Sequence, residues 1–178
     1  MPLLTLGHTR ICMLVKEEDS GMPRETRTTA QDCNCLAVRQ AARHVTQFYD
    51  RFLAPAGLRT TQFSILARLR RKGAMTINAL AADMVMDRTT LGRNIQPLER
   101  DGLIRIEPGT SDRRSKVIHL TKRGEKRLEA AYDGWAEAQT RFESAFGGTR
   151  ASDLRLLLRA VTATDFGHTN DAATMVDA

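Results

Sequence analysis

The sequence predicts a mainly α-helical fold with one small β-hairpin. Two observations carry this prediction. Between residues 32 and 164, apolar residues recur mostly at the three- and four-residue spacing of amphipathic helices. One stretch departs from that period: the partly alternating, β-branched segments "LIRIE" and "KVIHLT" flank a loop, "PGTSDRRS", that is rich in turn-forming residues. We therefore expect helices on both sides of a single hairpin.

The first helix is expected within residues 32–57. Apolar side chains follow a helical period from Leu36 to Phe52, Asp32 is a favourable N-cap, and the helix should end near Pro55. The polar, Thr-rich stretch before residue 32 predicts a flexible N-terminal extension, in which Met22 offers an alternative start.

Three helices then follow, joined by very short turns. Thr60 or Thr61 is expected to cap the first, Thr76 the second and Asp87 the third, since their side-chain oxygens can accept from free backbone N–H groups. A strand, a loop and a second strand come next, and Thr121 should cap a long helix. A last helix follows the Gly-Gly break after residue 146.

The third helix of this series, "DRTTLGRNIQPLER", has Leu91, Ile95 and Leu98 as its inward stripe. Pro97 lies inside it and has no N–H to offer the carbonyl of Arg93, so we expect a bend there.

The terminal helices lie outside this compact central unit. The last helix has apolar residues at Leu154, Leu157, Leu158 and Val161. The apolar faces of the terminal helices would remain in water in a monomer, which predicts a homodimer paired through them. The expected organisation is an extension (1–31), an N-terminal dimerisation helix (32–57), a central unit (58–121), C-terminal dimerisation helices (122–164) and a disordered tail (165–178).

Positive charge is concentrated in the central unit. The whole chain has a net charge of +6, and residues 58–123 contain fourteen Lys and Arg against six Asp and Glu. This asymmetry predicts a polyanionic partner, with nucleic acid ahead of an anionic membrane surface. The chain lacks the ~18-residue apolar run of a membrane span and a signal-peptide cleavage site, so we expect a cytoplasmic protein without membrane attachment. Its three cysteines do not form a zinc framework, and no cofactor or metal is expected.

The predicted order of elements, a helix, a short helix, a third helix and then a hairpin, is that of a winged helix-turn-helix. The second helix of the helix-turn-helix motif enters the DNA major groove. The outward face of the corresponding helix here should carry Arg88, Thr89, Thr90, Arg93, Asn94 and Gln96. Arginine can fork onto guanine, and Asn or Gln can pair with adenine, so these side chains are expected to read base edges in double-stranded DNA. A merely solvated helix face is the plainer alternative.

The segments "TQFSILARL", "INALAADMVMDRTTLGRNIQPLERDGLI", "SDRRSKVIHLT" and "TKRGEKRL" together resemble the multiple antibiotic resistance regulator (MarR) family of transcription factors. The resemblance implies a winged helix-turn-helix homodimer that binds a pseudo-palindromic operator, usually as a repressor, and that a ligand or oxidant releases. No nucleophile–base spacing, metal-ligand set or phosphate-binding loop stands out in the sequence, so we expect no enzymatic activity. A non-specific architectural DNA-binding protein is the alternative of another class, although the wedge residues and long basic tails typical of such proteins are missing.

The hairpin tip supplies the expected wing contacts, Asp112, Arg113, Arg114 and Lys116. Beside the recognition helix, a wing arginine can enter the narrow, negative minor groove. We expect Arg114 to do so, held in orientation by Asp112 through a bidentate pair, while Arg113 contacts phosphate.

Two switches are expected from the sequence and the resemblance. In one, a small aromatic ligand binds near Arg39, Arg43, His44 and Phe63, with a cation pairing its carboxylate. His44 is equally well explained as a partly buried polar residue without a ligand. In the other, Cys33 and Cys35 sense oxidant from the first turn of the helix; on a helix, residues two apart diverge, which favours a disulfide across the dimer. The two cysteines can also be small residues that serve only packing and have no redox role.

Overall fold

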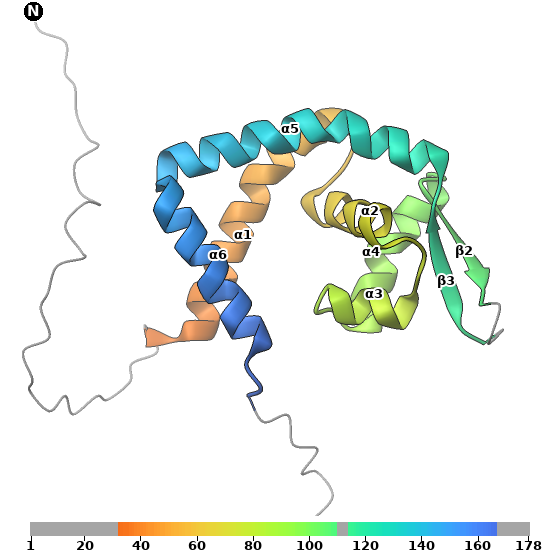
Figure 1. Ribbon diagram of the computed structural model, residues 1–178, viewed down its shortest axis with the longest axis horizontal. Coiled ribbons are helices and arrows are strands. Elements are labelled where there is room, and N and C mark those ends of the chain that lie inside the picture. The colour runs from red at the N-terminus through yellow and green to blue at the C-terminus, as the bar shows by residue number, and fades with distance from the viewer. Residues whose placement is uncertain (1–31, 110–113, 167–178) are drawn as a thin grey trace, which may run out of the picture. The chain divides into compact units, whose positions relative to one another are not determined.

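The computed structural model describes residues 32–109 and 114–166. Residues up to Val38 belong to a unit separate from Arg39–Ala178. The elements, in chain order and as labelled in Figure 1, are α1 (Asn34–Leu53), the 3-10 turn η2 (Ala54–Ala56), α2 (Thr60–Lys72), β1 (Met75–Thr76), α3 (Ile77–Asp83), α4 (Arg88–Arg100), β2 (Ile104–Pro108), β3 (Lys116–Leu120), α5 (Lys122–Phe146) and α6 (Gly148–Ala163). The predicted fold class, mainly helical with a small hairpin, is confirmed.

The sheet has one strand more than the predicted hairpin. Its three strands are antiparallel in the order β1-β3-β2, with Ile106 opposite Ile118 in the hairpin and Met75 opposite Ile118 on the other edge. β1 has only two residues, too few to show an alternating pattern in the sequence. It ties the start of α3 to the wing strands, so the hairpin and the helix-turn-helix form one body.

A single apolar core holds the helix-turn-helix on the sheet. Its fully buried members come from α1 to α5, β2, β3 and the turn before β2: Leu53, Ile65, Leu66, Leu69, Leu80, Leu91, Leu98, Leu103, Ile104, Ile118 and Leu128. Each full burial of such a side chain contributes roughly 1.5–3 kcal/mol. The orientation of α4 is therefore fixed by packing along its length.

Three of the predicted helix caps are confirmed. Thr76, Asp87 and Thr121 each accept a hydrogen bond from the backbone N–H three residues further on, at 3.1, 2.8 and 3.0 Å. These bonds satisfy N–H groups that the first turn of a helix leaves without partners. They fix where α3, α4 and α5 begin.

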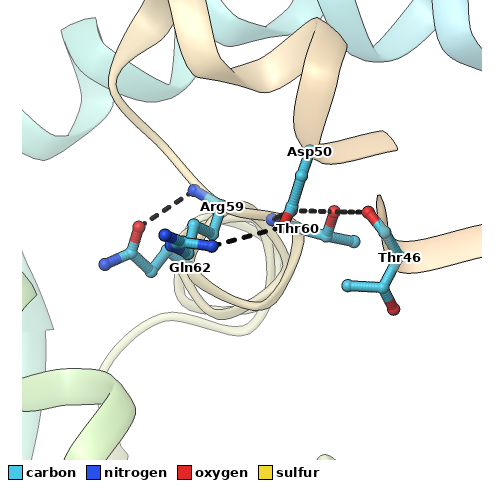
Figure 2. A network of polar contacts seen from close by, with 5 residues as sticks. All are labelled: Thr46, Asp50, Arg59, Thr60 and Gln62. Atoms are coloured by element: carbon cyan, nitrogen blue, oxygen red, sulfur yellow. Dashed lines mark hydrogen bonds and ion pairs between the residues drawn. The ribbon is translucent and has the colours of Figure 1, made fainter. Parts of the chain in front are cut away.

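The start of α2 is capped differently from the prediction. Arg59 is the N-cap residue, and its backbone N–H donates to the side chain of Gln62 at 2.9 Å. Asp50, from α1, accepts from both the backbone N–H and the hydroxyl of Thr60, each at 2.7 Å (Figure 2). The predicted N-cap role of Thr60 or Thr61 is wrong. The Asp50 carboxylate of the preceding helix α1 instead accepts the backbone N–H of Thr60 in the first turn of α2.

We expect Asp50→Ala to lower the free energy of unfolding by about 1–3 kcal/mol, because it leaves the partly buried Thr60 N–H without its charged acceptor. Asp50→Asn retains an acceptor oxygen and should cost less than half as much. Urea unfolding of both variants measures the difference. Equal losses for the two substitutions would contradict a hydrogen-bonding role for this side chain.

Candidate nucleic-acid interface

α4 divides into a buried and an exposed face. Leu91, Ile95 and Leu98 are buried, as the apolar spacing predicted, and the other side of the helix faces solvent. Its exposed residues include Arg88, Thr89, Thr90, Arg93 and Gln96, whereas Asn94 is half-buried. The helix runs without interruption through Pro97 to Arg100. The bend expected at Pro97 stays a prediction.

Two of the six expected base-reading residues are engaged within the helix. The hydroxyl of Thr90 donates to Asp87 at 2.6 Å, and the amide of Asn94 donates to the carbonyl of Thr90 at 2.8 Å. The hydrogen bonds from Thr90 hold the pKa of the Asp87 carboxyl below its usual range. Among the described residues, the arginines of this face, Arg88 and Arg93, form no ion pair, so their guanidinium groups are available to a polyanion.

The turn before α4 contains a strained residue. Val85 has φ 52°, a left-handed conformation that a β-branched side chain rarely adopts, and its side chain is 73% exposed. The turn is closed by backbone hydrogen bonds from Val85 to Ala82 at 3.1 Å and from Met86 to Ala81 at 2.8 Å. These contacts place Asp87, and with it the start of α4, directly after α3.

Asp83, the last residue of α3, is held by two cations of α2. One carboxylate oxygen lies 2.9 Å from the Arg68 guanidinium, and the other contacts the Lys72 ammonium. The hydrogen bond from Lys72, assisted by the charge of Arg68, lowers the pKa of Asp83. This cluster joins α2 to α3, the two helices that support α4.

The lowered pKa of Asp83 gives a pH dependence with a definite sign. Because the carboxylate is favoured in the fold, its contribution to stability is complete above its unfolded pKa and is lost as the pH falls through the lower folded pKa. We expect the Tm of wild type to fall more steeply than that of Asp83→Asn as the pH drops below about 4. Thermal melts across that range test this, and parallel curves would contradict it.

The wing is described only in part. Arg114 and Lys116 are exposed next to the start of β3, whereas Asp112 and Arg113 lie outside the described residues, so the expected Asp112–Arg114 pair stays a prediction. At the base of the hairpin, Glu107 lies 3.3 Å from Arg105 and 3.4 Å from His119. The contact with His119 links β2 to β3, whereas Arg105 and Glu107 lie on the same strand.

The comparisons with known proteins agree with this geometry. The family model described as "MarR family" matches residues 58–116. The chain is 30% identical over 115 residues to the HTH-type transcriptional regulator PecS of Dickeya dadantii, covering 63% of this chain and 69% of PecS. It is 34% identical over 92 residues to the regulator YwoH of Bacillus subtilis, covering 52% of this chain and 66% of YwoH. The chain belongs to the MarR family.

A solved structure of a MarR-family regulator is matched over nearly all of its own chain. The Mycobacterium tuberculosis transcriptional regulator MosR in complex with DNA is 39% identical, has a TM-score of 0.64, and is matched over 97% of its chain and 74% of this one. This MarR-family protein is accordingly a transcription regulator that binds DNA. Within the described ranges, no helix is long and apolar enough to cross a membrane.

The structure separates the residues expected at the effector site of this MarR-family regulator. Arg39, Arg43 and His44 are exposed on α1. His44 lines a hollow of about 260 Å³ with apolar residues of α1 and α5, including Phe48. Phe63 instead lines a different cavity, against α5, so His44 and Phe63 do not share a cavity within one chain, and an effector site formed by these residues stays a prediction.

The cavity at Phe63 measures about 480 Å³ and is lined from α2, the α3–α4 turn, α5 and one residue of α6: Phe63, Ser64, Ala67, Arg68, Asp83, Met84, Val85, Tyr132, Trp135 and Thr162. Sequence reasoning missed this set apart from Phe63. The helical period places Tyr132 and Trp135 on the inner side of α5, but the sequence does not reveal that this side meets Arg68 and Val85.

The two cysteines lie at the start of α1, and the expected cap there is wrong. α1 begins at Asn34, and Cys33 occupies the N-cap position: its carbonyl accepts from the N–H of Ala37 at 3.0 Å, and its sulfur accepts from the N–H of Leu36 at 3.4 Å. Cys33 and Cys35 are both exposed free thiols. Cys33, one residue after the expected Asp32, is therefore the N-cap residue of α1.

Proposed function

We propose that this regulator is a homodimeric repressor that binds a pseudo-palindromic operator and leaves it when a small aromatic ligand binds. The observation that carries the DNA-reading part is the exposed face of α4. It presents Arg88, Arg93 and Gln96 as long hydrogen-bond donors beside the hairpin, while its other face is anchored in the core. Such donors discriminate base edges in the major groove.

The homodimer is supported by the exposed apolar surface of α6. Leu156, Leu157, Leu158 and Val161 are exposed by 60, 66, 42 and 46%. Neighbouring apolar residues that stay exposed to solvent on a helix typically form a surface that contacts another protein. Pairing two copies through this surface would relate the two α4 helices by a two-fold axis, and half-sites about 34–36 Å apart would then match one turn of DNA.

Selection of duplexes from a random pool tests sequence-specific reading. We expect enrichment of an inverted repeat and an affinity that falls steeply with salt, because phosphate contacts release counterions. Equal affinity for selected and random duplexes would overturn the proposal and favour the architectural alternative. A reporter with the selected site inside its promoter then tests repression: transcription should fall when the protein is present, and a rise would indicate an activator.

Substitution on α6 tests the dimer. Leu157→Asp places a charge on the apolar surface and should shift sedimentation from dimer to monomer and weaken operator binding. Ser152→Asp adds the same charge at an exposed polar position of the helix and should leave the mass unchanged. A Leu157→Asp protein that stays dimeric would show that the dimer forms elsewhere.

A thiol switch is a second candidate, favoured by the position of Cys33. The Sγ of Cys33 is exposed at the start of α1, where it accepts from the N–H of Leu36 at 3.4 Å, so peroxide can reach it. Peroxide would oxidise this sulfur to a sulfenic acid, and a second thiol would displace water to form a disulfide. Since Cys33 precedes the helix, the divergence expected of two helical neighbours does not apply to it.

We expect peroxide to release wild-type protein from its selected duplex and to leave Cys33→Ser bound. Mass spectrometry under non-reducing conditions distinguishes a bond within one chain to Cys35 from a bond across the dimer. Release that persists in the Cys33→Ser/Cys35→Ser variant would exclude the thiol switch and leave the ligand switch.

A further inference from the structure

A hydrogen-bonded pair of residues is exposed at the start of α4. Asp87, the N-cap residue, accepts the backbone N–H of Thr90 on one carboxylate oxygen at 2.8 Å and the hydroxyl of Thr90 on the other at 2.6 Å. The first bond is the usual cap, because it satisfies a free N–H of the first helical turn. The second bond is not required by the cap, yet it fixes where the proton of an exposed hydroxyl points.

The direction of this second hydrogen bond follows from the chemistry of its two groups. A threonine hydroxyl has one proton and two lone pairs, whereas an ionised carboxylate can only accept. The hydroxyl and the backbone N–H of Thr90 hold the pKa of the Asp87 carboxyl below its usual range, so the group is ionised at neutral pH. Thr90 therefore donates its proton to Asp87, and its oxygen can only accept from a partner outside the helix.

The Thr90 oxygen is well placed for such a partner. Thr90 is exposed in the first turn of α4, and the N-terminal residues of a recognition helix contact base edges. Leu91, the next residue, is fully buried and anchors this turn in the core. The side-chain amide of Asn94 donates to the Thr90 carbonyl at 2.8 Å. The backbone and the hydroxyl of Thr90 are thus both held in place before DNA binds.

The bases differ in the group that they offer to a hydroxyl in the major groove. Cytosine N4 and adenine N6 are amino donors, whereas guanine O6 and thymine O4 are keto acceptors. A free threonine hydroxyl pairs with either kind, because it can donate or accept. With its proton held by Asp87, the Thr90 hydroxyl can accept from an amino group but cannot donate to a keto oxygen, where lone pairs would face each other.

We infer that Thr90 is a specificity-determining residue whose hydroxyl accepts a hydrogen bond from the exocyclic amino group of adenine or cytosine, and that Asp87 sets this polarity. Asp87 is the positioning residue of the pair, because it acts on the base through the Thr90 proton. The inference rests on the proposed DNA-reading function of α4 and deepens it. It assigns adenine or cytosine to one base position in each half-site and excludes guanine and thymine there.

Competition binding with single-base variants of the selected duplex locates the contact. We expect wild type to prefer adenine or cytosine over guanine or thymine at one position of the half-site, by roughly three- to tenfold. Thr90→Val removes the hydroxyl with little change in shape and should lose this preference at that position alone, while Thr90→Ser should keep it. A Thr90→Val protein with the wild-type preference at every position would refute the contact. So would a loss at a position where wild type prefers guanine or thymine.

Removal of the amino group from the DNA distinguishes the two bases. Unsubstituted purine in place of adenine, or 2-pyrimidinone in place of cytosine, deletes the amino donor of that base. The analogue of the base in the selected duplex should weaken wild-type binding by the same roughly three- to tenfold relative to its effect on Thr90→Val. This comparison cancels the weaker base pairing of the analogue. An equal loss in both proteins would contradict the assignment, because another side chain would then take the amino group.

Asp87→Asn tests the polarity itself. Asparagine is as favourable an N-cap residue as aspartate, and its amide oxygen must face the Thr90 N–H, which can only donate. Its NH2 group then replaces the second carboxylate oxygen and donates to the Thr90 hydroxyl, whose proton turns outward. The base preference should therefore shift from adenine or cytosine toward guanine or thymine. A purely structural role would weaken binding to all sequences alike and retain the amino preference, and that result would rule out the role of Asp87.

The double variant Asp87→Asn/Thr90→Val is the matched control, because it loses the same charge and has no hydroxyl to reverse. It should not discriminate between amino and keto bases at this position. A preference for guanine or thymine that persists in the double variant would arise from the lost charge rather than from the Thr90 proton, and would contradict the inference.

Failure of this inference is distinguishable from failure of the proposed function. A protein that enriches an inverted repeat and keeps every base preference in Thr90→Val reads DNA without this contact. A protein that binds selected and random duplexes equally lacks the DNA-reading function, and the inference falls with it.

Discussion

Gly124→Ala is expected to lower the free energy of unfolding by about 3 kcal/mol or more, because a methyl group at this position has no room. A Cβ there would lie 2.1 Å from the carbonyl oxygen of Leu103 and 2.7 Å from a methyl carbon of Leu120. The Leu103 carbonyl cannot move away, since it accepts the backbone N–H of Thr121 at 3.1 Å. The first turn of α5 would have to separate from the sheet.

Gly92→Ala is the matched control. This glycine also lies inside a helix, but a Cβ there would have nothing within 4 Å. Alanine should stabilise α4 by up to about 1 kcal/mol. Urea unfolding of the two variants measures both changes. A Gly124→Ala protein as stable as wild type would contradict the close approach of α5 to Leu103.

Arg93→Ala is expected to weaken binding to the selected duplex by about 1–3 kcal/mol and to relax the preference at one base pair in each half-site. Arg93 is exposed at the middle of the α4 face, opposite the buried Ile95 side of the helix. Binding measurements distinguish a base contact from a phosphate contact. Loss of a phosphate contact lowers the affinity for all DNA sequences alike and reduces the salt dependence of binding.

Arg51→Ala removes the same charge from an exposed position at the end of α1 and serves as the control. Competition binding with a panel of single-base variants of the selected duplex separates the outcomes. An Arg93→Ala protein with the full base preference of wild type would show that another residue reads that position.

The sequence predicts features that depend on neighbouring residues. Thr76, Asp87 and Thr121 could be placed as caps because a cap acts on a group only three residues away. The buried stripe of α4 follows from helical spacing in the same way. These local signals were enough for the fold class and for the exposed face of α4 that we propose reads DNA.

Features that depend on distant residues could not be predicted. Asp50 caps α2 from another helix, and β1 is a strand only because β3 lies beside it. The cavity needs α2, the α3–α4 turn and α5 together, and its Arg68–Asp83 pair spans fifteen residues. At the start of α1, residue type alone predicted the wrong N-cap. Asp is a more favourable N-cap residue than Cys, but Asp32 lies one position before the N-cap, which Cys33 occupies.

Native mass spectrometry of the complex with the selected duplex, combined with hydroxyl-radical footprinting, tests the central claim most directly. We expect two chains per duplex and two equivalent protected regions about 10 base pairs apart, one for each α4, related by the symmetry of the site. One chain per duplex, or protection that is uniform along any sequence, would contradict a homodimer that reads a pseudo-palindromic operator.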